Sequence, residues 1–268
     1  MTARGRRRGR RVAVVLGSVA LVAAAVVVVV ALLSTPRVEP RGEPVTRAGS
    51  PVPVSGVPIE APPHGDVGEP GSIVDAAPGP APTARLDADW LARTARATEI
   101  PPRALIAYAW ADLVVSRETP SCGVGWNTLA GIGAIESDHG RHDGTGLDEN
   151  GYPSAPIRGR ALDGDGVMAI ADTDGGAWDG DTVWDRAVGP MQFIPETWRR
   201  WGADASGDGV ADPNQIDDAA LAAARYLCAS GSMQDPAGWR QAILRYNDLD
   251  QYVADVARTA NRYADQTR

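Results

Sequence analysis

The sequence predicts a mainly α-helical domain with a short β-hairpin or flap, preceded by a transmembrane helix and a disordered, proline-rich linker. Three observations support this fold class. An apolar run covers residues 12–33, twelve of the 21 prolines lie between residues 34 and 83, and helical periodicity begins at residue 85. We therefore expect a basic segment at 1–11, an anchor at 12–33, a linker at 34–84 and a folded domain at 85–268.

The amino-terminal segment has the features of a single-pass membrane anchor. Six arginines stand within the first eleven residues, and the apolar run that follows is 22 residues long. A helix needs about 20 apolar residues to cross a bilayer, whereas a cleavable signal has an apolar core of about 7 to 15 residues. We expect an uncleaved anchor, with a cleaved signal as the alternative. Its basic end should stay cytoplasmic, which places the folded domain on the extracytoplasmic side of the cell membrane.

Composition separates the linker from the folded domain. The linker is rich in Pro, Gly, Ser and Val without periodicity, so it cannot bury enough apolar surface to fold and should act as an extended spacer. Residues 1–84 carry nine arginines and six acidic residues, whereas residues 85–268 carry 17 arginines and 28 acidic residues. The acidic domain argues against nucleic acid as a partner, because binding phosphates requires cations.

Capping and breaker residues divide the folded domain into helices around one acidic section. From His142 to Asp185 the chain is rich in Asp and Gly, and we expect a flap there, with Val167–Ile170 as a short strand and Thr182–Trp184 as its return. Turn chemistry explains the Asp-Gly pairs, with a bound cation as the alternative. Helices are expected at Asp87–Thr98, from an opening at Pro101-Pro102 through Leu113, around Glu136, and at Pro195–Trp201, Asp217–Ala229, Pro236–Tyr246 and Leu249–Asp265.

Glu136 occupies a position that packing alone does not explain. On a helix it shares a face with Leu129 and Ile132, so its side chain should point inward. Gly131 and Gly133 each weaken a helix by roughly 1 kcal/mol relative to alanine. We therefore expect tertiary packing to hold this helix and another segment to approach it closely.

The end of this helix bears on the acidity of Glu136. Gly140 is expected as the stop signal, which puts Glu136 in the last turn. There the helix dipole and partial burial both disfavour a negative charge, so the pKa of Glu136 should rise and its carboxyl group should suit a general acid. The alternative is a structural glutamate paired with an arginine such as Arg141.

Two further sequence motifs follow Glu136 along the chain. Gly189-Pro190-Met191-Gln192-Phe193-Ile194-Pro195 predicts a turn into a helix, and Tyr246-Asn247 predicts a helix end. Neither is specific alone. Together with Glu136-Ser137, in this order and spacing, they resemble the lysozyme-like lytic transglycosylases of peptidoglycan. Pro195 and the acidic loop after it resemble the membrane-bound lytic murein transglycosylase B branch. The resemblance covers about residues 87 to 265, without the anchor and the linker.

The resemblance implies a lysozyme-like fold and a lytic transglycosylase catalytic domain at 85–268, with Glu136 as the sole catalytic carboxylate. Glu136 would protonate the oxygen between N-acetylmuramic acid (MurNAc) and N-acetylglucosamine (GlcNAc). It would then act as base toward the MurNAc C6 hydroxyl, which leaves a 1,6-anhydro end without water. This chemistry needs no cofactor. Peptidoglycan glycan strands on the cell-wall side are the implied substrate, and other cell-wall enzymes are candidate partners.

The same resemblance assigns residues to substrate binding. Gln192 and Asn247 would hydrogen-bond sugar or acetamido groups, whereas Ser137 would orient the helix end. The full substrate-binding set is Ser137, Gln192, Phe193, Tyr246 and Asn247.

The two cysteines, Cys122 and Cys228, are expected to form a disulfide. In an oxidising, extracytoplasmic space a pair of cysteines favours a bridge over two buried thiols, which are the alternative. The bridge would close a loop of about 100 residues and stabilise the domain by up to about 4 to 5 kcal/mol.

Residues 204–210 match the opening of a calcium-binding loop with Gly209 at its sharp turn. The twelfth position is Gln215 rather than glutamate, so a later aspartate would supply the missing carboxylate, as in a variant loop of the branch that the chain resembles. Asp217 is the rival ligand or the helix N-cap, and a solvated Asx-turn loop or a sodium site are the alternatives. The expected structural Ca²⁺ ligands are Asp204, Ser206, Asp208, the backbone carbonyl of Val210, and Asp218.

Two other functions are compatible with the sequence. A hydrolytic muramidase would use the same acid to deliver water to the sugar. An inactive peptidoglycan-binding scaffold module would recruit other wall enzymes without cleaving the strand.

Overall fold

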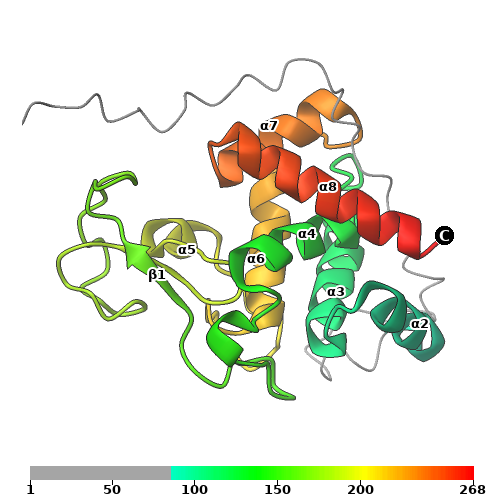
Figure 1. Ribbon diagram of the computed structural model, residues 1–268, viewed down its shortest axis with the longest axis horizontal. Coiled ribbons are helices and arrows are strands. Elements are labelled where there is room, and N and C mark those ends of the chain that lie inside the picture. The colour runs from blue at the N-terminus through cyan, green and yellow to red at the C-terminus, as the bar shows by residue number, and fades with distance from the viewer. Residues whose placement is uncertain (1–85) are drawn as a thin grey trace, which may run out of the picture. The chain divides into compact units, whose positions relative to one another are not determined.

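The computed structural model describes residues 86–268. The predicted basic segment, anchor and linker lie outside these residues. The described part is mainly helical with one two-stranded sheet, as predicted (Figure 1). No helix within it has the length and apolar character needed to cross a bilayer. Its elements are α2 (Ala88–Thr98), α3 (Pro102–Glu118), α4 (Trp126–Ser137), the 3-10 turn η2 (His142–Gly144), β1 (Arg158–Ala161), β2 (Arg186–Val188), α5 (Pro195–Trp201), α6 (Ile216–Cys228), α7 (Pro236–Tyr246) and α8 (Asp250–Gln266).

Helix ends follow local chemistry. Pro195 and Pro236 stand at the starts of α5 and α7, and both helices have the predicted bounds. Asp235 caps α7, because its side chain accepts hydrogen bonds from two backbone N–H groups of the first turn. The bounds of α2, α6 and α8 lie within one residue of the prediction.

Helix α4 is surrounded by other helices. It packs against α3 and α8, and α6 packs along α3 (Figure 1). Its glycines mark two of these contacts. A Cβ atom on Gly133 would overlap the Tyr108 hydroxyl of α3, and a Cβ atom on Gly131 would lie 3.2 Å from the Val256 carbonyl of α8. The close approach predicted from the two glycines is confirmed.

The end of α4 differs from the prediction. The helix ends at Ser137, and Asp138 is its C-cap in the left-handed conformation, with φ 50°. His139 is also left-handed, with φ 59°, and the predicted stop at Gly140 is therefore wrong. Such φ values are uncommon outside glycine, so tertiary contacts of the buried His139 decide this helix end rather than glycine chemistry. Glu136 nevertheless lies in the last turn.

The acidic section forms a flap, but its strands are not the predicted ones. The sheet consists of β1 and β2, which pair antiparallel with an irregular register. The predicted strand Val167–Ile170 and its return Thr182–Trp184 are wrong, because they contribute only isolated bridges at Ala169 and Trp184. Here the backbone N–H groups donate hydrogen bonds to aspartate side chains instead of to a neighbouring strand. Asp172 Oδ1 alone accepts three such bonds.

Cys122 and Cys228 form a disulfide, as predicted. Cys122 precedes α4, Cys228 is the last residue of α6, and their Cα atoms lie 5.3 Å apart. The bridge spans a sequence separation of 106 residues. It ties the segment that leads into α4 to the end of α6.

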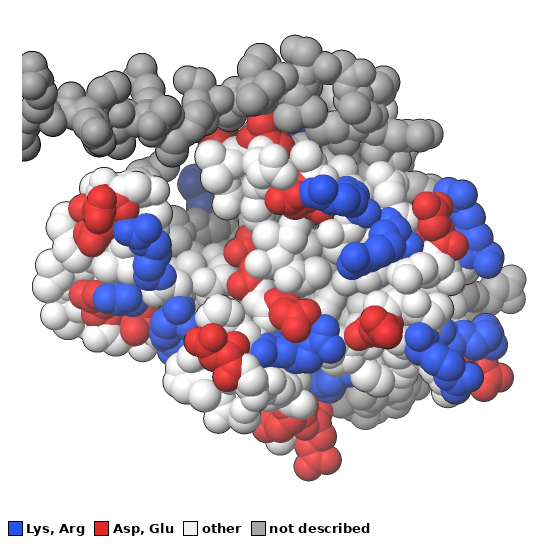
Figure 2. Space-filling view, in the orientation of Figure 1, with Lys and Arg blue, Asp and Glu red and all other residues white. Residues whose placement is uncertain are grey.

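Charged side chains of both signs are interspersed on the surface. On the face drawn in Figure 2, arginine and acidic side chains lie beside one another. Nine of the sixteen arginines between residues 86 and 268 form ion pairs with carboxylates. Most of these pairs are exposed, and an exposed pair contributes only about 0 to 1 kcal/mol. Arg103 with Asp217 is different, because their side chains are only 15% and 1% exposed.

Candidate active site

Glu136 lies half-buried in the last turn of α4, which also carries the fully buried Leu129 and Ile132. The Tyr252 hydroxyl of α8 donates a hydrogen bond to Glu136 Oε1 at 2.5 Å. Burial raises the pKa of Glu136 from 4.5 to about 7, although the Tyr252 hydrogen bond to the ionised form opposes this rise. Near neutral pH the carboxyl group is therefore divided between its protonated and ionised forms, which suits both a general acid and a general base.

Arg141 does not pair with Glu136. Its guanidinium donates hydrogen bonds to Asp138, one to Oδ1 at 2.7 Å and one to the backbone carbonyl at 3.1 Å. The alternative expectation, an ion pair between Glu136 and Arg141, is therefore wrong. The hydrogen-bond partner of the glutamate is the hydroxyl group of Tyr252.

His139 follows the end of α4 and is held between tyrosines of α3 and α8. It is 2% exposed, and its Nδ1 and Nε2 atoms lie 3.3 Å from the Tyr108 hydroxyl and 3.0 Å from the Tyr263 hydroxyl. Burial lowers the pKa of His139 to about 4, so the ring is neutral at physiological pH. A neutral, hydrogen-bonded ring adds no positive charge that would draw the pKa of Glu136 down.

Ser137 joins the end of α4 to the turn at 189–195. Its hydroxyl donates to the Pro190 carbonyl at 2.7 Å and accepts from the Gly140 N–H at 2.8 Å. The side chain is only 2% exposed. Both hydrogen bonds hold the residue next to Glu136 against the turn, so the geometry fits the orienting role expected of Ser137.

The turn itself requires an unusual backbone. Gly189 has φ 75°, and a Cβ atom there would overlap the Pro213 carbonyl. Gln192 has φ 51°, and its side-chain amide donates to the Gly189 carbonyl at 2.9 Å. Backbone hydrogen bonds between Val188 and Phe193, at 2.8 and 3.0 Å, close the turn. These bonds fix Phe193 at the base of the turn and Gln192 directly before it.

Aromatic side chains connect the turn to Glu136. The Phe193 ring lies edge-on to Tyr246, with centroids 6.0 Å apart, and the Tyr246 hydroxyl donates to the Met191 carbonyl at 2.7 Å. Tyr246 in turn stacks on Tyr252, with centroids 6.5 Å apart and planes 5° from parallel. Tyr252 holds Glu136, so a continuous contact path joins the carboxylate to the turn.

A groove of about 740 Å³ opens between the flap and the loop that joins α7 to α8. Four of the five predicted substrate-binding residues line it, namely Gln192, Phe193, Tyr246 and Asn247. Glu136 is not among the lining residues and adjoins the groove through Tyr252 and Tyr246. Burial raises the pKa of Tyr246, and the Glu136 charge raises it further, which reflects their proximity.

Sequence reasoning missed two elements of this site. Tyr252 carries no motif, and its bond to Glu136 crosses 116 positions of the chain. The apolar side of the groove comes from the flap, where Met168 is 73% exposed, and from Leu249, which is 61% exposed. Leu249 stands between two aspartates, whereas Met168 belongs to the apolar run at 167–170 that favoured a strand. No local pattern therefore marked either residue as part of a groove.

Residues 175–266 match the family described as the Transglycosylase SLT domain. This SLT segment contains the turn at 189–195, Tyr246, Asn247 and Tyr252, and Glu136 lies before it. The match therefore covers the part of the groove that follows residue 175, whereas the flap residues that line its other part, 162–170, lie before it. The contacts of Tyr252 and Ser137 bring α4 to this segment.

Two solved structures are similar to this chain over about two thirds of its length. One is the Escherichia coli lytic transglycosylase Slt35 in complex with bulgecin A, with 14% sequence identity, 66% of this chain and 78% of that chain covered, and a TM-score of 0.40. The other is SltB3 from Pseudomonas aeruginosa in complex with NAG-anhNAM-pentapeptide, with 15% identity, 66% and 74% coverage, and a TM-score of 0.35. No curated protein matches the chain.

The expected calcium loop, residues 204–218, lies within the SLT segment. Asp218 is fully buried, and its carboxylate accepts N–H bonds from Ala205, Ser206 and Asp212 at 2.7 to 3.0 Å. Burial raises the pKa of Asp218 to about 6, and the charge of Asp204 raises it further. The residues carry the oxygen atoms that Ca²⁺ prefers, but the carboxylates of Asp204, Asp208 and Asp218 do not all lie within 4.8 Å of one another, and backbone N–H groups already satisfy the Asp218 oxygens.

Asp217 has a separate role. Arg103 pairs with it, and the Gln215 side-chain amide donates to it at 2.6 Å. The N-cap of α6 is Gln215, whose Oε1 accepts from the N–H groups of Asp217 and Asp218 at 2.6 and 2.9 Å, so the expectation of an Asp217 cap is wrong. Asp217 thus joins α6 to α3.

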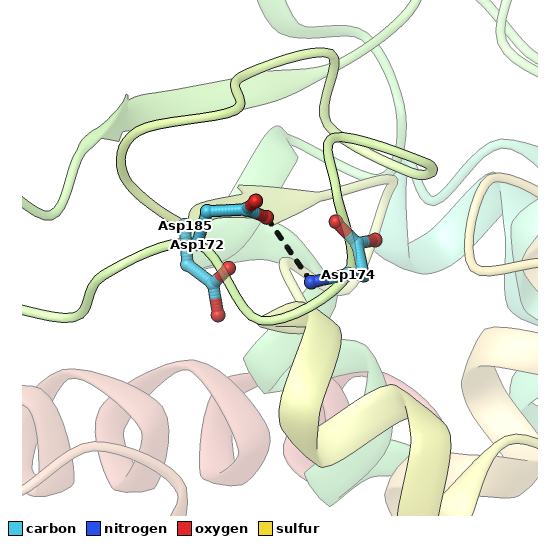
Figure 3. Close-up of side chains that lie close together, drawn as sticks. All are labelled: Asp172, Asp174 and Asp185. Atoms are coloured by element: carbon cyan, nitrogen blue, oxygen red, sulfur yellow. Dashed lines mark hydrogen bonds between the residues drawn. The ribbon is translucent and has the colours of Figure 1, made fainter.

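A second acidic group lies in the flap. Among residues 86–268, Asp172, Asp174 and Asp185 are the one set of three acidic side chains with oxygens within 4.8 Å of one another (Figure 3). Asp174 N–H donates to Asp172 at 3.1 Å, and Thr173 donates to both oxygens of Asp185 at 2.8 Å. These bonds shape the flap turns, in line with the predicted turn chemistry.

Proposed function

We propose that the domain is a lytic transglycosylase that cleaves the MurNAc–GlcNAc bond of peptidoglycan without water and leaves 1,6-anhydroMurNAc ends. The observation that carries the proposal is the half-buried Glu136 with a pKa of about 7, placed next to a groove that the SLT segment lines in part. A carboxyl group in this state gives up a proton and takes one back near neutral pH at little cost.

The proton returns to the group that supplied it. Protonated Glu136 donates its proton to the glycosidic oxygen as the bond between that oxygen and MurNAc C1 breaks. The MurNAc C6 hydroxyl then adds to C1, and the Glu136 carboxylate takes the hydroxyl proton. The strand is cut into a GlcNAc end and an anhydro end, and the enzyme returns to its starting state without a cofactor.

Neighbouring residues would serve this cycle. Tyr252 holds Oε1 of Glu136 and stabilises the carboxylate once the proton has left. Gln192 and Asn247, which line the groove, would hydrogen-bond sugar or acetamido groups. Ser137 would act by holding α4 against the turn.

Product analysis tests this proposal. Purified peptidoglycan is digested with the wild-type domain, with Glu136→Gln and with Glu149→Gln, an exposed control, and the fragments are analysed by mass spectrometry. We expect anhydro ends from the wild type and the control and none from Glu136→Gln. Ends heavier by one water would identify a hydrolytic muramidase instead, and strand binding without any cleavage would identify a scaffold module.

We also propose that the chain belongs to the membrane-bound lytic murein transglycosylase B branch and works on the cell-wall side of the membrane, held by an uncleaved helix at 12–33. The Cys122–Cys228 disulfide supports an oxidising location, since such bridges are rare in the cytosol. Membrane fractionation followed by amino-terminal sequencing tests the anchor. A soluble, shortened chain would contradict it.

Finally, we propose that Asp204, Ser206, Asp208, Val210 and Asp218 bind a structural Ca²⁺ ion. The buried Asp218 supports this, because burial disfavours its negative charge and a bound Ca²⁺ ion would offset that cost. Calcium should raise the melting temperature of the wild type but not of Asp218→Asn. An equal response of both proteins, or an equal effect of sodium, would contradict a Ca²⁺ site formed by this set.

A further inference from the structure

A second cavity, of about 620 Å³, lies beside the groove and is basic. It is formed by α5, the last turn of α7 and Tyr226 of α6, and its lining includes Arg199, Arg200 and Arg245 against one acidic residue, Glu196. This is unusual for a folded domain with 17 arginines and 28 acidic residues. Three guanidinium groups around one cavity create a locally positive potential.

Arg245 is held in place by aromatic rings. Its guanidinium carbon lies 4.8 Å from the Tyr226 ring centre and 5.7 Å from the Trp201 ring centre. The Tyr226 hydroxyl donates to the Arg245 carbonyl at 2.8 Å and fixes the backbone as well. Stacking uses the faces of the guanidinium and leaves the N–H groups at its edge for an acceptor. Within the described part of the chain, the one hydrogen bond at this edge is a 3.4 Å contact to Ser230.

The arginines of this cavity form few ion pairs with carboxylates of the described chain. Among residues 86–268, neither Arg200 nor Arg245 forms an ion pair, in contrast to the nine arginines that do. Arg199 meets Glu196 only at 3.9 Å, with both side chains more than half exposed. Such a pair is weak and easily exchanged. The cavity therefore retains the capacity to bind an anionic ligand.

The cavity continues into the groove, because Thr197, Tyr226 and Arg245 line both. A glycan strand in the groove therefore lies next to the arginines. In peptidoglycan the stem peptides branch from MurNAc and carry free carboxylates, whose planar shape matches the paired N–H groups of arginine. We propose that the basic cavity is a subsite for stem-peptide carboxylates, so the enzyme prefers strands that keep their peptides. This inference rests on the proposed function.

The test compares two substrates and two variants. The substrates are soluble, uncrosslinked glycan strands with their stem peptides, and the same strands after an amidase has removed the peptides. Arg199→Gln/Arg200→Gln removes two charges that line only the basic cavity. Arg93→Gln/Arg96→Gln removes the same charge from exposed positions on α2, outside both cavities.

We expect the cavity variant to lose at least about tenfold in kcat/KM on peptide-bearing strands, mainly through KM, because hydrogen bonds to charged groups are strong. Activity on stripped strands should stay unchanged, and the α2 variant should behave as the wild type on both substrates. An equal loss on both substrates, or no loss on peptide-bearing strands, would overturn the subsite.

A binding measurement separates this inference from the proposed function. Calorimetric titration with N-acetylmuramyl pentapeptide is done in the Glu136→Gln background, where no cleavage occurs. Binding that weakens at least about tenfold in the cavity variant supports the subsite even if the wild type cleaves neither strand. Unchanged binding overturns the subsite even if wild-type cleavage confirms the enzyme.

Discussion

Replacing Glu136 with glutamine should stabilise the folded domain, and the gain should depend on pH. Folding moves the pKa of Glu136 from 4.5 to about 7, so ionising it costs more in the folded state. Below the unfolded-state pKa both states are protonated and no penalty exists. As the pH rises through 7, the folded wild type loses stability relative to a neutral side chain.

The size of the gain follows from the two pKa values. Each pKa unit corresponds to about 1.4 kcal/mol, so a pKa near 7 instead of 4.5 gives roughly 3 kcal/mol at pH 8 and nothing near pH 4. Glutamine keeps an oxygen that accepts the Tyr252 hydrogen bond, so packing at the site is preserved. Catalysis should be lost in the same variant.

Urea denaturation at pH 4, 6 and 8, with the disulfide intact, measures this difference. The free energy of unfolding of Glu136→Gln should exceed that of the wild type by an amount that grows with pH, whereas Glu149→Gln should show no such trend. A constant difference between Glu136→Gln and the wild type, or a deficit at pH 8, would refute the claim that burial disfavours the Glu136 charge.

Three further substitutions probe the contacts around the site. Tyr252→Phe removes a hydrogen bond that lowers the pKa of the acid, so the alkaline limb of the kcat/KM profile should move up by about one pH unit while the rate falls; an unmoved limb would mean that the bond does not act on the carboxylate. Gly133→Ala places a Cβ atom on the Tyr108 hydroxyl and should cost roughly 1 to 3 kcal/mol of unfolding free energy. Adding Tyr108→Phe should restore part of it, and a failure to do so would point to a different clash. Replacing Cys122 and Cys228 with serine should lower the unfolding free energy by about 4 to 5 kcal/mol, given the loop that they close, and wild type measured with reductant should match; a loss below about 1 kcal/mol would contradict the chain-entropy account.

Sequence patterns predicted the parts of the fold that local chemistry controls. Pro195 and Pro236 set the starts of α5 and α7, since proline at the first turn needs no donor. The paired glycines of α4 correctly predicted close neighbours, because only glycine admits the Tyr108 hydroxyl at that distance. The inward position of Glu136 followed from helical spacing in the same way.

Long-range contacts decided what the sequence did not predict. His139 adopts a left-handed conformation because tyrosines from α3 and α8 hold its ring, so α4 ends before Gly140. The flap sheet uses Arg158–Ala161, which lacks a strand-like alternation, while aspartate side chains satisfy the backbone around Val167–Ile170. Tyr252 reaches Glu136 only after α8 has packed on α4. No local pattern encodes these contacts.

The central claim is that burial holds the pKa of Glu136 near neutrality. Carbon-13 NMR of glutamate-labelled protein, with Glu136→Gln to assign the resonance, measures this directly. We predict a titration midpoint of about 7 for the Glu136 carboxyl group, against 4.5 for an ordinary glutamate. A midpoint close to 4.5 would contradict the account, because the carboxyl group would then carry no proton to donate at neutral pH.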